Sequence, residues 1–222
     1  MRQVFPDLWQ TSTEHPLRDY PHTACNAYLL VRQSGNILFY STGREAIGRV
    51  NDGAADHERI EELGGVGHIL LGHWHEASPS VRTIRDRFGA TLICHARDAP
   101  PIEKEAGVAP DITFWNRQAI LGDIEAFPTP GHTVGSACYL HNSPHGHTYL
   151  FTGDTIWPAR GSWTSVTFED DANQSSHRSS LDLLAMLEPT VVLSAVAPGE
   201  TFAEIAASDW PSAIQAAKAR LG

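Results

Sequence analysis

The chain has 222 residues, 41% hydrophobic and 19% charged, which excludes a wholly disordered polymer and allows one compact domain or two small ones. Its formal net charge is −10 and no run of Lys or Arg offsets it, so the composition argues against binding to a nucleic-acid backbone. No apolar stretch approaches the roughly 18 residues that cross a bilayer, and the start of the chain lacks the apolar core of a signal peptide, so we expect a soluble cytoplasmic protein without a membrane partner.

The first half of the chain alternates apolar strands with helices. Its predicted elements are strands over 25–32, 36–41, 66–71 and 90–95, and helices over 54–63 and 80–88. The Gln-Ser-Gly at 33–35 predicts a hairpin between the first two strands. Gly89 is placed where it would end the second helix. Strands and helices in alternation indicate a layered α/β fold.

The second half repeats this pattern more loosely. Its predicted elements are strands over 118–127, 136–141, 148–152 and 191–193, and helices over 177–187 and 210–221. Pro189 would stop the first of these helices, and Pro211 suits the first turn of the last one. His177 is expected near a helix start, where the dipole disfavours its cationic form.

Chemically useful side chains follow several predicted strands. His73 and His75 come directly after one strand, His132 follows the turn made by Pro-Gly, and Asp154 follows another strand. Neutral imidazole is a good ligand for zinc and iron, and loops at strand ends can converge while a sheet holds them. These residues are therefore the candidate metal ligands.

Five motifs in this order resemble those of the metallo-β-lactamase-fold hydrolase superfamily, along essentially the whole chain. They are Asn26-Ala27-Tyr28-Leu29-Leu30, Thr42-Gly43, His73-x-His75, the TPGHT at 129–133 and the TGD at 152–154. The resemblance implies a four-layer αββα sandwich in a single domain over 1–222, made of two similar halves, approximately 1–115 and 116–222.

The sequence departs from the family where the second of its two metals would bind. The family motif His-x-His-x-Asp-His has Ala77 and Ser78 in its last two positions here, and the late histidine is absent from the segment 194–196. The resemblance assigns the first metal to His73, His75 and His132, all present. We therefore expect one divalent transition metal at most, zinc as the first choice and iron as the alternative.

The resemblance implies a mononuclear hydrolase that acts on a small-molecule substrate of unknown identity. A three-histidine zinc site can lower the pKa of water to about 7, and Asp154 is either a fourth ligand or the group that orients this water. One alternative is a non-catalytic binding protein that retains the cleft. The other is an iron oxidoreductase similar to sulfur dioxygenases, with His73, His132 and Asp154 as ligands.

Neighbouring polar and aromatic residues leave further alternatives. Glu76 is a candidate to contact the metal or to serve as a base, with an exposed loop carboxylate as the alternative. The exposed carboxylate is favoured, because adjacent side chains on an extended segment point apart. Ser165 has no evident base, which argues against a serine nucleophile. The tryptophans near the motifs are candidate pocket walls, with plain packing as the alternative; they are Trp74, Trp157 and Trp163.

Overall fold

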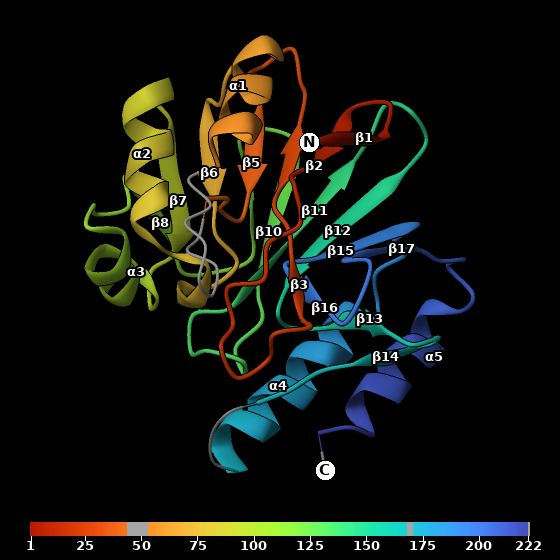
Figure 1. Cartoon of the computed structure of the whole chain (residues 1–222). Coiled ribbons are helices and arrows are strands. Elements are labelled where there is room, and N and C mark those ends of the chain that lie inside the picture. Colours follow the sequence, from red (N-terminus) through yellow and green to blue (C-terminus); the bar gives the residue numbers. More distant parts are fainter. Residues whose placement is uncertain (44–52, 168–170, 222) are drawn as a thin grey trace.

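The computed structural model describes residues 1–43, 53–167 and 171–221. Two sheets face each other and helices lie outside them, which confirms the predicted αββα sandwich (Figure 1). The helices beside the first sheet are α1 (Ala54–Glu62), α2 (Pro79–Phe88) and α3 (Ala99–Ala106). Those beside the second sheet are α4 (Asp171–Leu184) and α5 (Trp210–Lys218).

The first sheet comes from the earlier part of the chain. Its strands, in spatial order, are β1 (Arg2–Phe5), β2 (Leu8–Gln10), β4 (Tyr28–Leu30), β5 (Ile37–Phe39), β6 (His68–Leu70), β7 (Thr91–His95) and β8 (Ile112–Phe114). β4 and β5 form the predicted antiparallel hairpin. β5 to β8 are parallel, so the loops that follow them emerge at one edge of the sheet.

The second sheet comes from the later part of the chain. Its strands, in spatial order, are β17 (Phe202–Glu204), β15 (Val191–Ser194), β12 (Thr148–Gly153), β11 (Ala137–Asn142), β10 (Ile124–Pro128) and β9 (Gln118–Ile120). The single strand predicted over 118–127 is wrong, because Leu121 and Gly122 adopt positive φ angles of 52° and 85° and turn the chain between β9 and β10.

Two short pairs of strands complete the structure. β3 (Ala24–Cys25) pairs with β16 (Val196–Ala197), which joins the beginning of the chain to the segment after β15. β13 (Trp157–Ala159) and β14 (Ser162–Thr164) form a hairpin beside α5. None of the described helices is long and apolar enough to pass through a membrane.

The helix boundaries show where the local sequence is enough to predict a helix end and where it is not. α2 ends as predicted at Gly89, whose φ of 68° is left-handed and whose N–H donates to Arg85 O at 2.8 Å. α3 was not predicted, although its two prolines lie in the first turn, where the missing N–H groups break no helical hydrogen bond. α4 begins before the predicted 177, because the polar residues that open it have no apolar periodicity, and His177 lies inside the helix.

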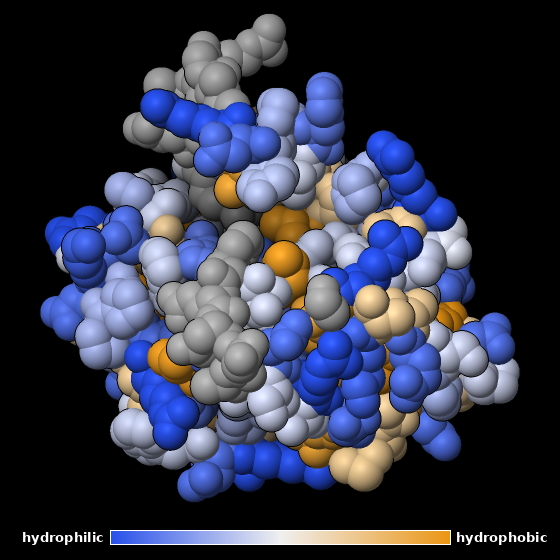
Figure 2. Space-filling view, turned by 90° about the horizontal axis from the view of Figure 1, so that it is seen from below, coloured by the Kyte–Doolittle hydropathy of each residue, from blue (hydrophilic) through white to orange (hydrophobic). Residues whose placement is uncertain are grey.

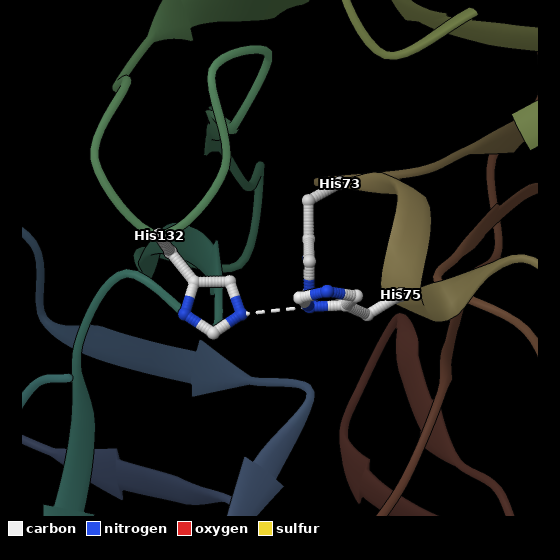
Figure 3. Close-up of side chains that lie close together, drawn as sticks. All are labelled: His73, His75 and His132. Atoms are coloured by element: carbon white, nitrogen blue, oxygen red, sulfur yellow. Dashed lines mark hydrogen bonds between the residues drawn. The ribbon is translucent and has the colours of Figure 1, made fainter. Parts of the chain in front are cut away.

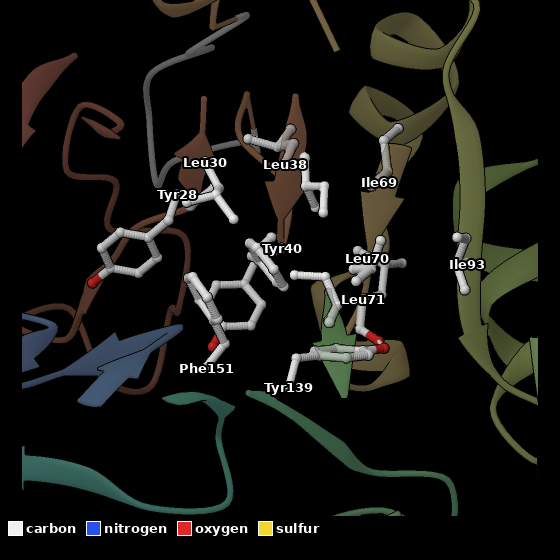
Figure 4. Close-up of a cluster of buried hydrophobic side chains, with 14 of the residues drawn as sticks. Tyr28, Leu30, Leu38, Tyr40, Ile69, Leu70, Leu71, Ile93, Tyr139 and Phe151 are labelled. Carbon is white, nitrogen blue, oxygen red and sulfur yellow. Dashed lines mark hydrogen bonds between the residues drawn. The ribbon is translucent and has the colours of Figure 1, made fainter. Parts of the chain in front are cut away.

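The core between the sheets is rich in aromatic side chains (Figure 4). Phe39 of β5 stacks on Phe151 of β12, with ring centroids 3.6 Å apart and an interplanar angle of 6°. Tyr139 of β11 packs beside them, 5.8 Å from the Phe39 ring. This contact between strands of both sheets fixes how their edges meet, and hence where the loops at those edges lie.

Two buried tyrosines connect the sheets through hydrogen bonds. The Tyr40 hydroxyl donates to Leu193 O at 2.8 Å and accepts from Gly153 N–H at 2.8 Å. From the second sheet to the first, the Tyr139 hydroxyl donates to Leu71 O at 2.6 Å. Tyr40 therefore holds the end of β12 one residue before Asp154, and Tyr139 holds the chain just before the segment that carries His73 and His75.

Tyr40→Phe is expected to lower the free energy of unfolding by about 1–3 kcal/mol, because it leaves the buried Gly153 N–H without an acceptor. Tyr139→Phe is the matched control: it removes one donated hydrogen bond and leaves no buried donor unpaired by that change. Urea unfolding of both variants measures the difference. A loss in Tyr40→Phe no larger than that in Tyr139→Phe would contradict the role assigned to the Tyr40 hydroxyl.

Candidate metal centre

Three loops at strand ends bring the candidate ligands together. β6 leads into a single 3-10 turn, η1 (Trp74–Glu76), with His73 in extended conformation immediately before it. β10 leads into the Thr-Pro-Gly turn before His132, and β12 ends at Gly153, directly before Asp154. The sheet core described above holds all three strands, so the loops have fixed starting points.

The three imidazoles face one another (Figure 3). His75 Nδ1 lies 3.0 Å from His132 Nε2, although the two residues are 57 positions apart in the sequence. The ring of His73 lies 5.0 Å from that of His75 and 4.7 Å from that of His132. One nitrogen from each ring falls within 4.8 Å of the others, which is the arrangement of a shared metal site.

Asp154 lies beside the three imidazoles. Its Oδ2 lies 3.4 Å from His73 Nε2 and 3.6 Å from His132 Nε2. Among the described residues, its Oδ1 is buried without a hydrogen-bond partner, and the only partner of His73 Nε2 is this ion-pair contact with Oδ2. Weakly paired buried ligand atoms that face the same cluster are what a bound cation would satisfy, so the four residues fit a metal ion. The sequence-based candidate ligands therefore lie together.

Glu76 is not the exposed loop carboxylate that the sequence predicted. It is only 1% exposed, because η1 turns the chain instead of extending it. Its Oε1 lies 2.9 Å from His73 Nδ1, and its Oε2 accepts from Gly72 N–H at 2.6 Å. The contact favours a proton on His73 Nδ1, and His73 Nε2 faces the cluster.

His132 is oriented in the same way by a backbone group. Its Nδ1 lies 3.3 Å from the carbonyl oxygen of Val166, which favours a proton on Nδ1 and a lone pair on Nε2. Gly131, just before it, packs against His177 of α4, where a Cβ would come within 2.3 Å of the His177 Cβ. Glycine is therefore needed for this approach to α4.

The charges of the cluster also fit a cation. Burial alone would lower the pKa of His73, but the carboxylates of Asp154 and Glu76 raise it to about 10. Burial would likewise raise the pKa of Asp154, and its contact with His73 instead lowers it to about 2. Burial and the charge of His73 lower the pKa of His75 to about 4 and that of His132 to about 3. Two imidazoles are therefore neutral at pH 7, beside carboxylates that require positive charge.

Asp98, which the sequence did not single out, connects the two histidine loops. This buried residue precedes α3, and its Oδ2 accepts hydrogen bonds from Trp74 N–H at 3.0 Å and from the Thr133 hydroxyl at 2.7 Å. Gly135 lies against the same carboxylate, where a Cβ would be 2.4 Å from Oδ1. One side chain thus fixes the segments that carry His75 and His132 relative to each other. Nothing in the spacing of the motifs predicts this contact.

Ser165 has a histidine partner that the sequence did not reveal. Its Oγ lies 2.6 Å from His177 Nε2, and both groups also contact Thr155 O. Burial lowers the pKa of His177. Because Ser165 and His177 are both buried, the pair supports the packing of α4 and does not present a nucleophile to a substrate.

The cluster opens into a cavity of about 570 Å³ that Trp74, His75, His132 and Asp154 help to line. A larger cavity, of about 810 Å³, lies between the β13–β14 hairpin and α5 and contains none of the candidate ligands. Trp163 lines that second cavity and packs on Trp210, so its role is packing, whereas Trp74 is a wall of the site.

Glu76→Gln is expected to lower the affinity for zinc by about tenfold. A carboxylate accepts from both His73 Nδ1–H and Gly72 N–H, whereas an amide must turn its NH₂ group toward one of these donors. Competition with a chromogenic chelator measures the affinity. Glu103→Gln, an exposed change on α3, is the control, and equal affinities for the two variants would contradict the assigned role of Glu76.

Sequence comparison matches residues 80–196, more than half of the chain, to the family described as the Metallo-beta-lactamase superfamily. The hydroxyacylglutathione hydrolase of Klebsiella pneumoniae subsp. pneumoniae is 31% identical over 129 residues, which are 57% of this chain and 46% of that protein. The hydroxyacylglutathione hydrolase of Acidiphilium cryptum is 31% identical over 146 residues, which are 64% of this chain and 55% of that protein. The chain thus spans about half the length of the curated relatives it matches.

Solved structures share the whole fold at low identity. A metallo-beta-lactamase from Pontibacter korlensis has a TM-score of 0.73 and 16% identity, and the match covers 99% of this chain and 97% of that one. The DIM-1 metallo-beta-lactamase has a TM-score of 0.72 and 14% identity, with coverage of 99% and 94%. Together with the family match over more than half of its length, the four layers and the histidine cluster between their loops show that the chain belongs to the metallo-beta-lactamase superfamily.

Proposed function

We propose that the chain is a metal-dependent hydrolase that binds one divalent transition metal, zinc in the first place, at His73, His75 and His132. The observation that carries the proposal is the convergence of one nitrogen from each imidazole, with Asp154 beside them, at the base of an open cavity. The names of the curated relatives, hydroxyacylglutathione hydrolases, support hydrolysis of a thioester or ester as the reaction.

The chain's own residues have distinct tasks in this proposal. His73, His75 and His132 would hold the ion, while Glu76 and the Val166 carbonyl keep His73 and His132 in the tautomers that ligation needs. When bound, zinc would make hydroxide available near neutral pH and polarise the scissile carbonyl. Asp154 either completes the ligand set or orients the attacking water, since its Oδ1 has no other hydrogen-bond partner.

Three positions support a single ion over two. Ala77 offers only a methyl group where the family has an aspartate. The Ser78 hydroxyl lies 2.7 Å from the Ser80 hydroxyl, and the Ser194 hydroxyl donates to the carbonyls of Val196 and Thr201. His73, Glu76 and Asp154 form a second group that could hold an ion, but this group shares His73 with the three-histidine site and has Asp154 beside both. The two oxygens of Glu76 also accept from His73 and Gly72, so a second ion would have no complete ligand set of its own among the described residues.

The test combines metal analysis with an assay on the full chain purified without chelator. The expected result is about one equivalent of zinc per chain and metal-dependent hydrolysis of a thioester or ester. Two equivalents would overturn the single-ion proposal, and less than a small fraction of an equivalent would overturn metal dependence. Iron with thiol-dependent oxygen uptake would favour the oxidoreductase alternative, in which His73, His132 and Asp154 are the ligands.

A further inference from the structure

Apolar side chains surround the candidate metal centre on its open side. The cavity of about 570 Å³ is of ordinary size for a small-molecule site. Besides His75, His132, Thr133 and Asp154, its described lining consists of Leu17, Tyr20, Trp74, Ala77, Val134 and Glu105. Only Glu105 among these six side chains is charged. The part of a substrate next to the reacting bond therefore meets mainly hydrocarbon and aromatic surface.

Half of the large hydrophobic side chains that are exposed in the described chain line this cavity, and they form its apolar wall: Leu17, Tyr20 and Val134. The large hydrophobic side chains exposed in the described chain are Leu17, Tyr20, Ile112, Trp115, Val134 and Met186. Three of these six line the one cavity: Leu17 is 38% exposed, Tyr20 60% and Val134 51%. They come from two separate segments of the chain. Exposed apolar side chains that gather around a cavity mark a ligand site, whereas isolated ones need no explanation.

The segment that carries Leu17 and Tyr20 is held by backbone hydrogen bonds. An antiparallel bridge between Glu14 and Cys25 closes its base. Tyr20 N–H donates to Leu17 O at 3.2 Å, and Thr23 N–H donates to Tyr20 O at 2.9 Å. The apolar wall is thus preformed, which lowers the entropy lost when a ligand binds.

Seen from below, the molecule is largely hydrophilic, with apolar residues toward the middle of this face (Figure 2).

Apart from the metal ion of the proposed function, the charged side chains among the described lining residues are all carboxylates. Glu105 and Asp154 are carboxylates, and none of the described lining residues is Lys or Arg. Lys104 Nζ lies 3.7 Å from Glu105 Oε1, but both side chains are exposed, so water screens this pair. Arg97 lines a separate cavity, of about 250 Å³, on the other side of Val134. The proposed metal ion faces the reacting bond, so substrate carboxylates that lie farther out, beside Glu105 and the apolar side chains, meet no described Lys or Arg to receive them.

We propose that the site acts on uncharged, apolar thioesters or esters and discriminates against substrates whose leaving group carries carboxylates, as glutathione does. This inference rests on the proposed hydrolase function and specifies its substrate class. In the reaction, the oxygen of water bonds to the acyl carbon, the C–S or C–O bond breaks, and the leaving thiol or alcohol takes up a proton from the water.

The test compares two thioesters of phenylacetic acid on the zinc-loaded full chain, one with uncharged N-acetylcysteamine and one with glutathione. We expect kcat/KM to be about tenfold higher for the uncharged thioester. Glu105→Lys should shift this ratio toward glutathione by about threefold or more. Glu103→Lys is the matched control, because it makes the same charge change on α3 outside the cavity lining and should leave the ratio close to that of the unmodified chain.

A preference for the glutathione thioester, or equal shifts in Glu105→Lys and Glu103→Lys, would overturn the inference while leaving the hydrolase function intact. Hydrolysis of neither thioester by a zinc-loaded chain would overturn the hydrolase function. The specificity is then judged by binding of both intact thioesters, followed through tryptophan fluorescence with and without zinc. Tighter binding of the uncharged thioester in both forms supports the inference, and binding of the glutathione thioester at least as tightly overturns it.

Discussion

His132→Ala is expected to lower the affinity for zinc by more than about 100-fold and to remove metal-dependent hydrolysis. Removal of a residue that only hydrogen-bonds a ligand lowers metal affinity by about 10–100-fold, and removal of a ligand itself should lower it further. In the structure, His132 Nε2 faces His75 Nδ1 at 3.0 Å and Asp154 Oδ2 at 3.6 Å. Alanine leaves His73 and His75 on one short segment, with Asp154 as the one other candidate ligand of the proposed site, so the three-histidine set is lost. The metal content after dialysis against a weak chelator measures the effect.

The control must show that the loss comes from ligation and not from misfolding. His145→Ala changes an exposed histidine in the turn between β11 and β12, at the opposite end of β12 from Asp154, and should retain the metal content of the unmodified protein. Circular dichroism and urea unfolding of both variants report on folding. A His132→Ala protein that is folded and still retains one equivalent of zinc would rule out His132 as a ligand.

Asp98→Ala is expected to lower zinc affinity by about 10–100-fold and the free energy of unfolding by about 1–3 kcal/mol. The change leaves Trp74 N–H and the Thr133 hydroxyl without their acceptor and releases the two histidine loops from each other. Asp98 touches no candidate ligand atom, so it acts by positioning the loops. Zinc competition measurements give the affinity, and urea denaturation gives the stability.

Asp98→Asn separates positioning from charge. An asparagine oxygen in the place of Oδ2 can accept both hydrogen bonds, and its NH₂ group replaces Oδ1, which has no partner in the structure. We expect this variant to bind zinc within a few-fold of the unmodified chain. If Asn lowered the affinity as much as Ala, the charge of Asp98 rather than its two hydrogen bonds would be responsible for the effect.

One contact of the site could have been predicted from the spacing of neighbouring residues. Glu76 follows His73 by three residues, and this spacing brings two side chains to the same side of one helical turn. The prediction failed because the segment was taken as extended. No element was predicted over α3, although two prolines can open a helix. In both cases a local signal was present in the sequence; for Glu76 the assumed backbone conformation was wrong, and for α3 the signal was not used.

The sequence by itself determined the features that depend on neighbouring residues: the β4–β5 hairpin, the end of α2 at Gly89 and the position of each histidine just after a strand. Turns and alternating apolar residues depend on the conformational preferences of a few adjacent residues, so they can be recognised in the sequence alone. Only the tertiary structure decided which imidazole nitrogens meet, that Asp98 joins the two loops, and that Leu17 and Val134 share a cavity. All of these contacts join segments that are distant in the sequence. Those of the imidazoles and of Asp98 form because packing of the two sheets buries polar groups that must find partners across the fold.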